Sequence, residues 1–134
     1  MKKKHKYNYS SQLLRRTAFF HGGYYVLTGL WSLVSISSFQ AVTGSKTDIW
    51  LVKTIGLLVT VSGLVFLYSA ARRSFPMETV ILAIGTALAL ALIEITYGSV
   101  GHISAVYLLD AVLEVFLAGL WITGVWKQRE ERTS

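Results

Sequence analysis

The chain has 134 residues, of which 53% are hydrophobic and 15% charged, and it contains no cysteine. This composition is too apolar for an ordinary soluble domain of this size and is typical of membrane proteins. The lack of cysteine excludes disulfides, thiolate metal sites and thiol catalysis. The formal net charge of +6 would suggest nucleic-acid binding in a soluble protein. Here the position of the charge along the chain matters more than its total, and we predict no nucleic-acid partner.

Four apolar stretches are long enough to cross a bilayer, which requires about 20 helical residues each. We predict spans at about 18–39, 49–71, 77–98 and 105–126. The predicted fold is therefore all-α: a polytopic membrane protein with four transmembrane helices in an up-down bundle. Residues 1–17 are predicted to be a basic cytoplasmic tail, 18–126 a single transmembrane domain, and 127–134 a charged cytoplasmic tail.

The distribution of Lys and Arg predicts the orientation in the membrane. Eleven of these residues lie in the two terminal segments or in the turn between the second and third spans, and only Lys46 and Lys53 lie on the other side. Positive charge accumulates on the cytoplasmic side of membrane proteins, so we expect both termini in the cytoplasm. The first apolar stretch is too long for a signal-peptide core, so we predict an uncleaved first span.

The polar and small residues of each span fall on one face of a helical wheel. This face carries Thr28 and Ser32 in the first span, Gly56 and Gly63 in the second, Glu94 in the third, and Asp110 and Glu114 in the fourth. In membranes, small and polar residues favour helix contacts, whereas aliphatic side chains face lipid. We therefore expect the three carboxylates to point into the bundle.

A charge inside the bilayer costs about 2.5–3.5 kcal/mol on insertion scales, so the three acids are the best candidates for function. Counting from the predicted helix ends, Glu94, Asp110 and Lys53 meet in the outer half of the membrane, with Tyr97 nearby. They could line an outward-facing cavity for a cation, a proton or a polar headgroup. The alternative is a structural network in which Lys53 forms an ion pair that ties the helices together.

Glu114 is predicted to lie at the membrane midplane, with no basic residue at its depth. Burial disfavours the charged form of a carboxyl group, so we expect Glu114 to be neutral at pH 7. Its expected partners are Thr28, Ser32 and the Trp31 indole. Such a carboxyl could carry a proton or bind a cationic ligand, or it could be only a hydrogen-bond donor. His21 is predicted to be an interfacial residue near the cytoplasmic end of the first span.

Enzyme chemistry has little support in this sequence. It contains no Glu-x-x-His pair for a di-iron site, no phosphate-binding loop and no serine nucleophile motif. We predict no catalytic residue, no cofactor and no metal. The pair Gly22-Gly23 is interpreted as a helix-packing surface.

Two segments carry a resemblance: SFQAVTGSKTDIWLVKT at 38–54 and HISAVYLLDAVLEV at 102–115. They resemble segments of small bacterial inner-membrane proteins with four helices. The resemblance implies a four-helix protein of the bacterial cell membrane, and it implies no particular activity.

Two functional hypotheses follow. In the first, the protein binds or moves a small molecule, a lipid headgroup or a proton through Glu94, Asp110, Glu114, Lys53, Tyr97, Ser32 and Thr28. In the second, it is a non-catalytic accessory or scaffold subunit of a membrane complex, with a structural polar interior. The lipid bilayer is the expected environment in both cases, and transport would require a homo-oligomer or a larger complex, because four short helices leave little room for a path.

Overall fold

The computed structural model describes residues 2–134, with side chains from Tyr9 onward. Over this range the chain forms five α-helices: α1 (Lys2–Val34), α2 (Ile36–Thr43), α3 (Ile49–Arg72), α4 (Met77–Ser99) and α5 (Val106–Thr133). By length and apolar composition, α3, α4 and α5 can each cross a membrane. The expected all-α fold is thus confirmed, and the predicted starts of the last three spans agree with the structure to within one residue.

The predicted first span at 18–39 is not one continuous helix. α1 ends at Val34, and the chain bends by 113° into α2. Ser35, at the bend, has φ −139° and ψ 76°, outside the helical region. Serine side chains compete with helical hydrogen bonds, and here the Ser38 hydroxyl donates to the Ser35 carbonyl at 3.1 Å. By length and apolar composition, α1 and α2 together have the features of a broken span or of a re-entrant segment.

The segments predicted as tails are helical. α1 begins at Lys2 and α5 continues to Thr133, so both helices extend beyond the predicted spans. Leu14 is fully buried, and a Cβ added to Gly124 would lie 2.6 Å from Leu14 Cδ2. Farther out, the Ser10 hydroxyl donates to Glu131 Oε2 at 2.6 Å. The two helices therefore remain in contact almost to the ends of the chain.

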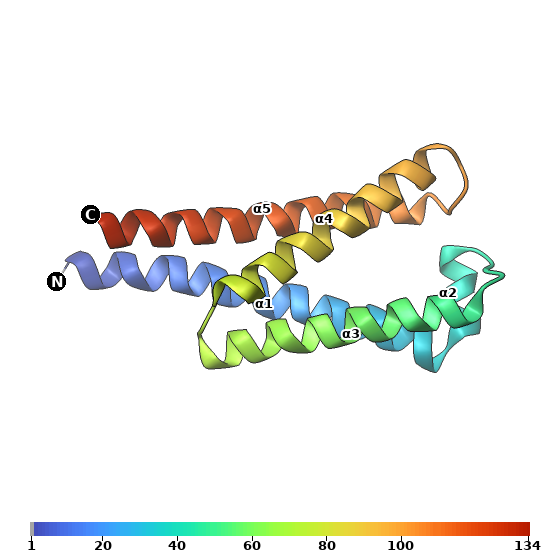
Figure 1. The fold of residues 1–134 in the computed structure, drawn as a ribbon, viewed down its shortest axis with the longest axis horizontal. Helices are drawn as coiled ribbons and strands as arrows, with labels where there is room; N and C mark the ends of the chain where they lie inside the picture. The colour runs from blue at the N-terminus through green and yellow to red at the C-terminus, as the bar shows by residue number, and fades with distance from the viewer. Residues whose placement is uncertain (1) are drawn as a thin grey trace.

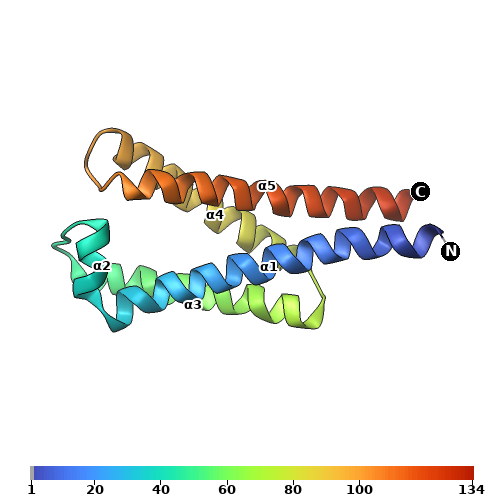
Figure 2. The same cartoon turned by 180° about the vertical axis from the view of Figure 1, so that it is seen from behind.

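The long helices form two antiparallel hairpins, α1 with α3 and α4 with α5 (Figure 1). The hairpins join through α1 and α5, which run antiparallel side by side. Both termini lie at one end of the molecule, and α2 lies at the opposite end (Figure 2). α3 and α4 are connected by a short loop at the terminal end and separate toward the other end.

Two pairs of glycines bring α1 and α3 unusually close. A Cβ added to Gly22 would lie 2.7 Å from the Gly63 carbonyl oxygen, and one added to Gly29 would lie 2.6 Å from the Gly56 carbonyl oxygen. Both helices space these glycines seven residues apart, so the pairs align in an antiparallel contact. Small residues at such a seam allow direct backbone packing in membranes. The predicted packing role is confirmed for Gly22, whereas Gly23 has open space beside it.

The hydrophobic core occupies the terminal half of the molecule. Leu14, Tyr25, Phe66 and Trp121 are its largest buried side chains, and they come from α1, α3 and α5. Many aliphatic residues outside the core remain exposed, as expected for a surface that faces lipid. Because the bulky side chains fill one end, the space between the hairpins at the α2 end is available for a cavity.

Candidate functional site

A cavity of about 610 Å³ lies between the hairpins at the α2 end, and all five helices contribute to its wall. Glu94 of α4 and both Asp110 and Glu114 of α5 line it. Asp110 and Glu114 are one helical turn apart, so their side chains project in the same direction. The structure thus brings the three predicted carboxyl groups to one space.

Aromatic side chains form much of the remaining wall. They are Tyr24, Tyr25, Trp31, Phe39 and Tyr107. Apolar residues of α3 and α5 complete it, and Thr28 and Ser32 are also lining residues. The cavity is therefore mostly apolar, with a few polar groups, as is usual for small-molecule sites.

The rim of the cavity is apolar. Val42, Leu51, Ile55 and Leu109 line the cavity and are 50%, 46%, 46% and 72% exposed, respectively. They come from α2, α3 and α5. A ligand that enters between these helices would cross a surface suited to hydrocarbon.

Two predicted site residues lie elsewhere. Lys53 is exposed on α3 and does not line the cavity. The lining positions of α3 include Val52, Ile55 and Gly56, and Lys53 projects to a different side of that helix. Tyr97 is 47% exposed, and its ring centroid lies 6.2 Å from that of His102. The expected meeting of Lys53 with Glu94 and Asp110 is therefore wrong.

No Lys, Arg or His is among the lining residues that the structure describes. Lys46 lies in the loop after α2, three residues beyond the lining residue Thr43, and its Nζ donates to the Thr43 and Gly44 carbonyls at 2.8 and 3.1 Å. Its ammonium also lies 5.1 Å from the centroid of the Tyr107 ring. Partial burial lowers the pKa of Lys46. The cavity wall thus carries acidic groups without a compensating basic side chain.

Glu94 and Asp110 form an outer pair. Both line the outer part of the cavity, and the Tyr24 hydroxyl donates to Asp110 Oδ1. Glu94 is only 5% exposed, and its Oε2 has no hydrogen-bond partner among the described residues. A buried polar atom without a partner is costly, so this oxygen marks a position where a ligand group would be stabilised. Among the described residues, no group of three or more His, Asp and Glu side chains could hold a metal ion.

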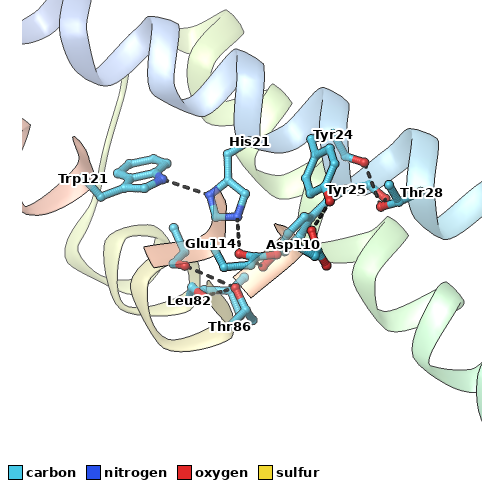
Figure 3. A network of polar contacts seen from close by, with 10 residues as sticks. His21, Tyr24, Tyr25, Thr28, Leu82, Thr86, Asp110, Glu114 and Trp121 are labelled. Carbon is cyan, nitrogen blue, oxygen red and sulfur yellow. Dashed lines mark hydrogen bonds and ion pairs between the residues drawn. The ribbon is translucent and has the colours of Figure 1, made fainter. Parts of the chain in front are cut away.

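Glu114 lies deeper, at the border between the cavity and the core, and is 1% exposed (Figure 3). The Tyr25 hydroxyl donates to its Oε2 at 3.0 Å, and His21 Nε2 lies 3.8 Å from the same oxygen. The Trp121 indole N–H donates to His21 Nδ1 at 3.0 Å. These four side chains form one polar network inside the core.

This network overturns three predictions. His21 is fully buried rather than interfacial, and a histidine does lie at the depth of Glu114. Thr28 and Ser32 donate to carbonyls of their own helix, at 2.8 Å each, rather than to Glu114. The Trp31 indole donates to Ser38 at 2.9 Å. The predicted depths were wrong because they were counted along a first helix that began at residue 18, whereas α1 begins at Lys2.

No pattern of apolar residues in the sequence identifies His21. The buried positions of α1 recur every three or four residues through Ser10, Leu14, Thr17, His21 and Tyr25, but three of these five residues are polar. The burial begins before the apolar stretch, so His21 lies in the middle of a buried face of α1.

Comparison of the chain with protein-family models, with curated protein sequences and with solved structures found no match. The resemblance to small four-helix inner-membrane proteins stays a prediction.

Proposed function

We propose that this protein is a small integral membrane protein that binds an organic cation with apolar substituents in the cavity lined by Glu94, Asp110 and Glu114. The observation that carries this proposal is an aromatic-walled cavity with three carboxyl groups and no basic residue on its described wall. Its volume falls in the range of roughly 300–1,000 Å³ that small-molecule sites occupy. Amphiphilic amines and quaternary ammonium groups, including those of lipid headgroups, belong to this ligand class.

Three features support a cation with apolar substituents. Aromatic faces attract organic cations through the ring quadrupole, and five aromatic residues line the wall. The unpartnered Glu94 Oε2 provides an acceptor for a cationic N–H donor or a negative group next to a quaternary nitrogen. The apolar rim matches the hydrocarbon part of an amphiphile.

A packed polar seam in which Lys53 forms an ion pair with the acids would favour the accessory-subunit hypothesis. Lys53 instead lies on an exposed part of α3, and the acids face open space. This arrangement favours the ligand-binding hypothesis. Movement of the ligand or of a proton across the membrane would be a further property of the same site.

The test is binding of tetraphenylphosphonium to the purified protein in detergent. We expect binding in the micromolar range or tighter, and a loss of at least about tenfold in affinity for Glu94→Gln and for Asp110→Asn, where tenfold corresponds to about 1.4 kcal/mol. Asp48→Asn is the matched control, because Asp48 is an exposed carboxylate outside the cavity.

Neutral triphenylphosphine oxide tests whether charge is recognised, and we expect it to bind more weakly than the cation. Equal binding of both compounds, or unchanged affinity in both cavity variants, would contradict the proposed function. If the two variants reduced only thermal stability, the accessory-subunit hypothesis would be favoured. Competition by amphiphilic amines or by vesicles of quaternary-ammonium lipid separates free ligands from lipid headgroups.

A further inference from the structure

The network behind the cavity controls which nitrogen of His21 carries a proton. Trp121 Nε1 is always a donor, so His21 Nδ1 must be the acceptor of their 3.0 Å hydrogen bond. The proton of the neutral imidazole is then on Nε2. A doubly protonated His21 would place two N–H groups against each other, so Trp121 opposes the imidazolium form.

His21 Nε2 points toward Glu114 (Figure 3). Nε2 is fully buried, and it has no hydrogen-bond partner among the residues whose side chains are described. At 3.8 Å it lies beyond hydrogen-bonding distance of Glu114 Oε2, and an approach of less than about 1 Å would close the bond. Tyr25 already donates to that oxygen at 3.0 Å. Two donors from α1 therefore converge on one carboxyl oxygen of α5.

We infer that Glu114 is a proton-exchange site: it holds a proton while the cavity is empty and releases that proton when an organic cation binds. The Tyr25 hydroxyl and the His21 Nε2–H then stabilise the carboxylate. The released proton passes through the cavity to water, and the charge of the ligand replaces it, so the total charge of the site is conserved. This inference rests on the proposed function and adds that binding is coupled to protons.

The surroundings of Glu114 distinguish it from the other two acids. The titratable groups around it are His21 and Tyr25 of α1, which contact it, and Tyr24 of α1, Glu94 of α4 and Asp110 of α5, which line the same cavity. The described residues of α2 and α3 on the cavity wall include none. Of these groups, only His21 and Tyr25 offer donors to Glu114 Oε2. Glu94 and Asp110 line the cavity, and no histidine is among its described lining residues.

The first experiment counts protons. Calorimetric binding of tetraphenylphosphonium to the intact protein is measured at one pH in phosphate and in Tris, whose different ionisation enthalpies report the protons released. We expect Glu114→Gln to release one proton fewer per bound cation than the unchanged protein. An equal count in both proteins would overturn the inference and leave the proposed function standing.

The second experiment does not depend on a ligand. Infrared difference spectra recorded during a pH titration should contain a carboxylic-acid C=O band that disappears with rising pH and is missing in Glu114→Gln. Absence of any titrating band that depends on Glu114 would overturn the inference even if tetraphenylphosphonium fails to bind. Circular dichroism confirms that the Gln variant is folded.

His21 is proposed as a positioning residue, so its test is a shift in pH rather than a loss of binding. His21→Phe removes the Nε2–H donor, and we expect the Glu114 infrared transition to move upward by about one pH unit, the tenfold change expected for one lost hydrogen bond to a charged group. A transition at the same pH in His21→Phe would show that His21 does not support the carboxylate.

Discussion

At the scale of single residues, Tyr24 and Tyr25 show how adjacent side chains serve different carboxyl groups. Tyr24 donates to Asp110 and Tyr25 to Glu114. Neighbouring residues project about 100° apart on a helix, whereas Asp110 and Glu114 are one turn apart along α5. The two tyrosines therefore hold both the depth and the rotation of α1 relative to α5.

Removal of the buried hydroxyl should weaken this contact. For Tyr25→Phe we expect a loss of about 0.6 kcal/mol in the free energy of unfolding, the average measured for polar contacts between membrane helices, and at most about 1.7 kcal/mol. The measurement is denaturation followed by circular dichroism in mixed detergent. Tyr68→Phe is the matched control, because Tyr68 is 61% exposed and contacts only Arg72 through its hydroxyl. Equal losses in both variants would contradict a specific role for Tyr25.

At the scale of helices, the glycine pairs make α1 and α3 one closely packed hairpin. Each added Cβ at Gly22, Gly29 or Gly63 would meet the backbone of the opposite helix. Backbone cannot move aside as a flexible side chain can. These contacts also fix the register of α1 along α3. Because His21 and Tyr25 belong to α1, the same contacts fix their position along α5.

The glycine seam predicts different outcomes for the same substitution. Gly63→Ala should force α1 and α3 apart and cost about 1–3 kcal/mol of unfolding free energy, as overpacking usually does. Gly85→Ala and Gly119→Ala should be neutral or stabilising by up to about 1 kcal/mol, because both sites have open space and alanine favours helix. Thermal denaturation of the three variants checks this. A Gly63 variant as stable as the other two would refute the close packing.

The separation of α2 from α1 is not explained by the helical periodicity of the sequence. α2 lies at the end of the bundle opposite the two termini (Figure 2). Its residues Phe39, Val42 and Thr43 line the cavity. Lys46 holds its carboxyl end by donating to the Thr43 and Gly44 carbonyls. This short helix therefore closes one side of the cavity, although it buries little surface of its own.

At the scale of the whole molecule, the two hairpins meet at the terminal end and separate toward the other. Bulky core residues such as Phe66 and Trp121 fill the first half, and the acidic cavity occupies the second. Motion that changes access to the cavity is expected at the contact between α1 and α5, because that contact joins the hairpins. His21, Tyr25, Glu114 and Trp121 lie at this contact.

The arrangement of the loops makes the orientation testable. Ser45 lies in the loop before α3 and Ser74 in the loop after it, so these two exposed residues lie at opposite ends of that helix, and the chain has no native cysteine. Given the positive-inside distribution, we expect Ser45→Cys to react with a membrane-impermeant maleimide in intact cells, and Ser74→Cys to react only after permeabilisation. The reverse pattern would place both termini outside the cytoplasm.

The sequence alone predicted the helices of the second half of the chain and the inward orientation of three carboxyl groups. Apolar length, the glycines and the basic loops are local signals, so they can be read without knowledge of the neighbouring helix. The break at Ser35 was missed because the apolar stretch continues through it. The helical ends of α1 and α5 were missed because charged residues suggested tails, although Leu14 and Gly124 pack together there.

The tertiary structure decided which groups the acids face. Lys53 and Tyr97 were expected near them by depth, but helix rotation places both outside the cavity. His21 was expected at an interface, and it lies instead 3.8 Å from Glu114. Counting residues from the helix ends predicts how deep each residue lies in the membrane, but it does not predict which helix its side chain faces. The register and rotation between α1 and α5 depend on contacts between residues about a hundred positions apart, and no local pattern in the sequence contains them.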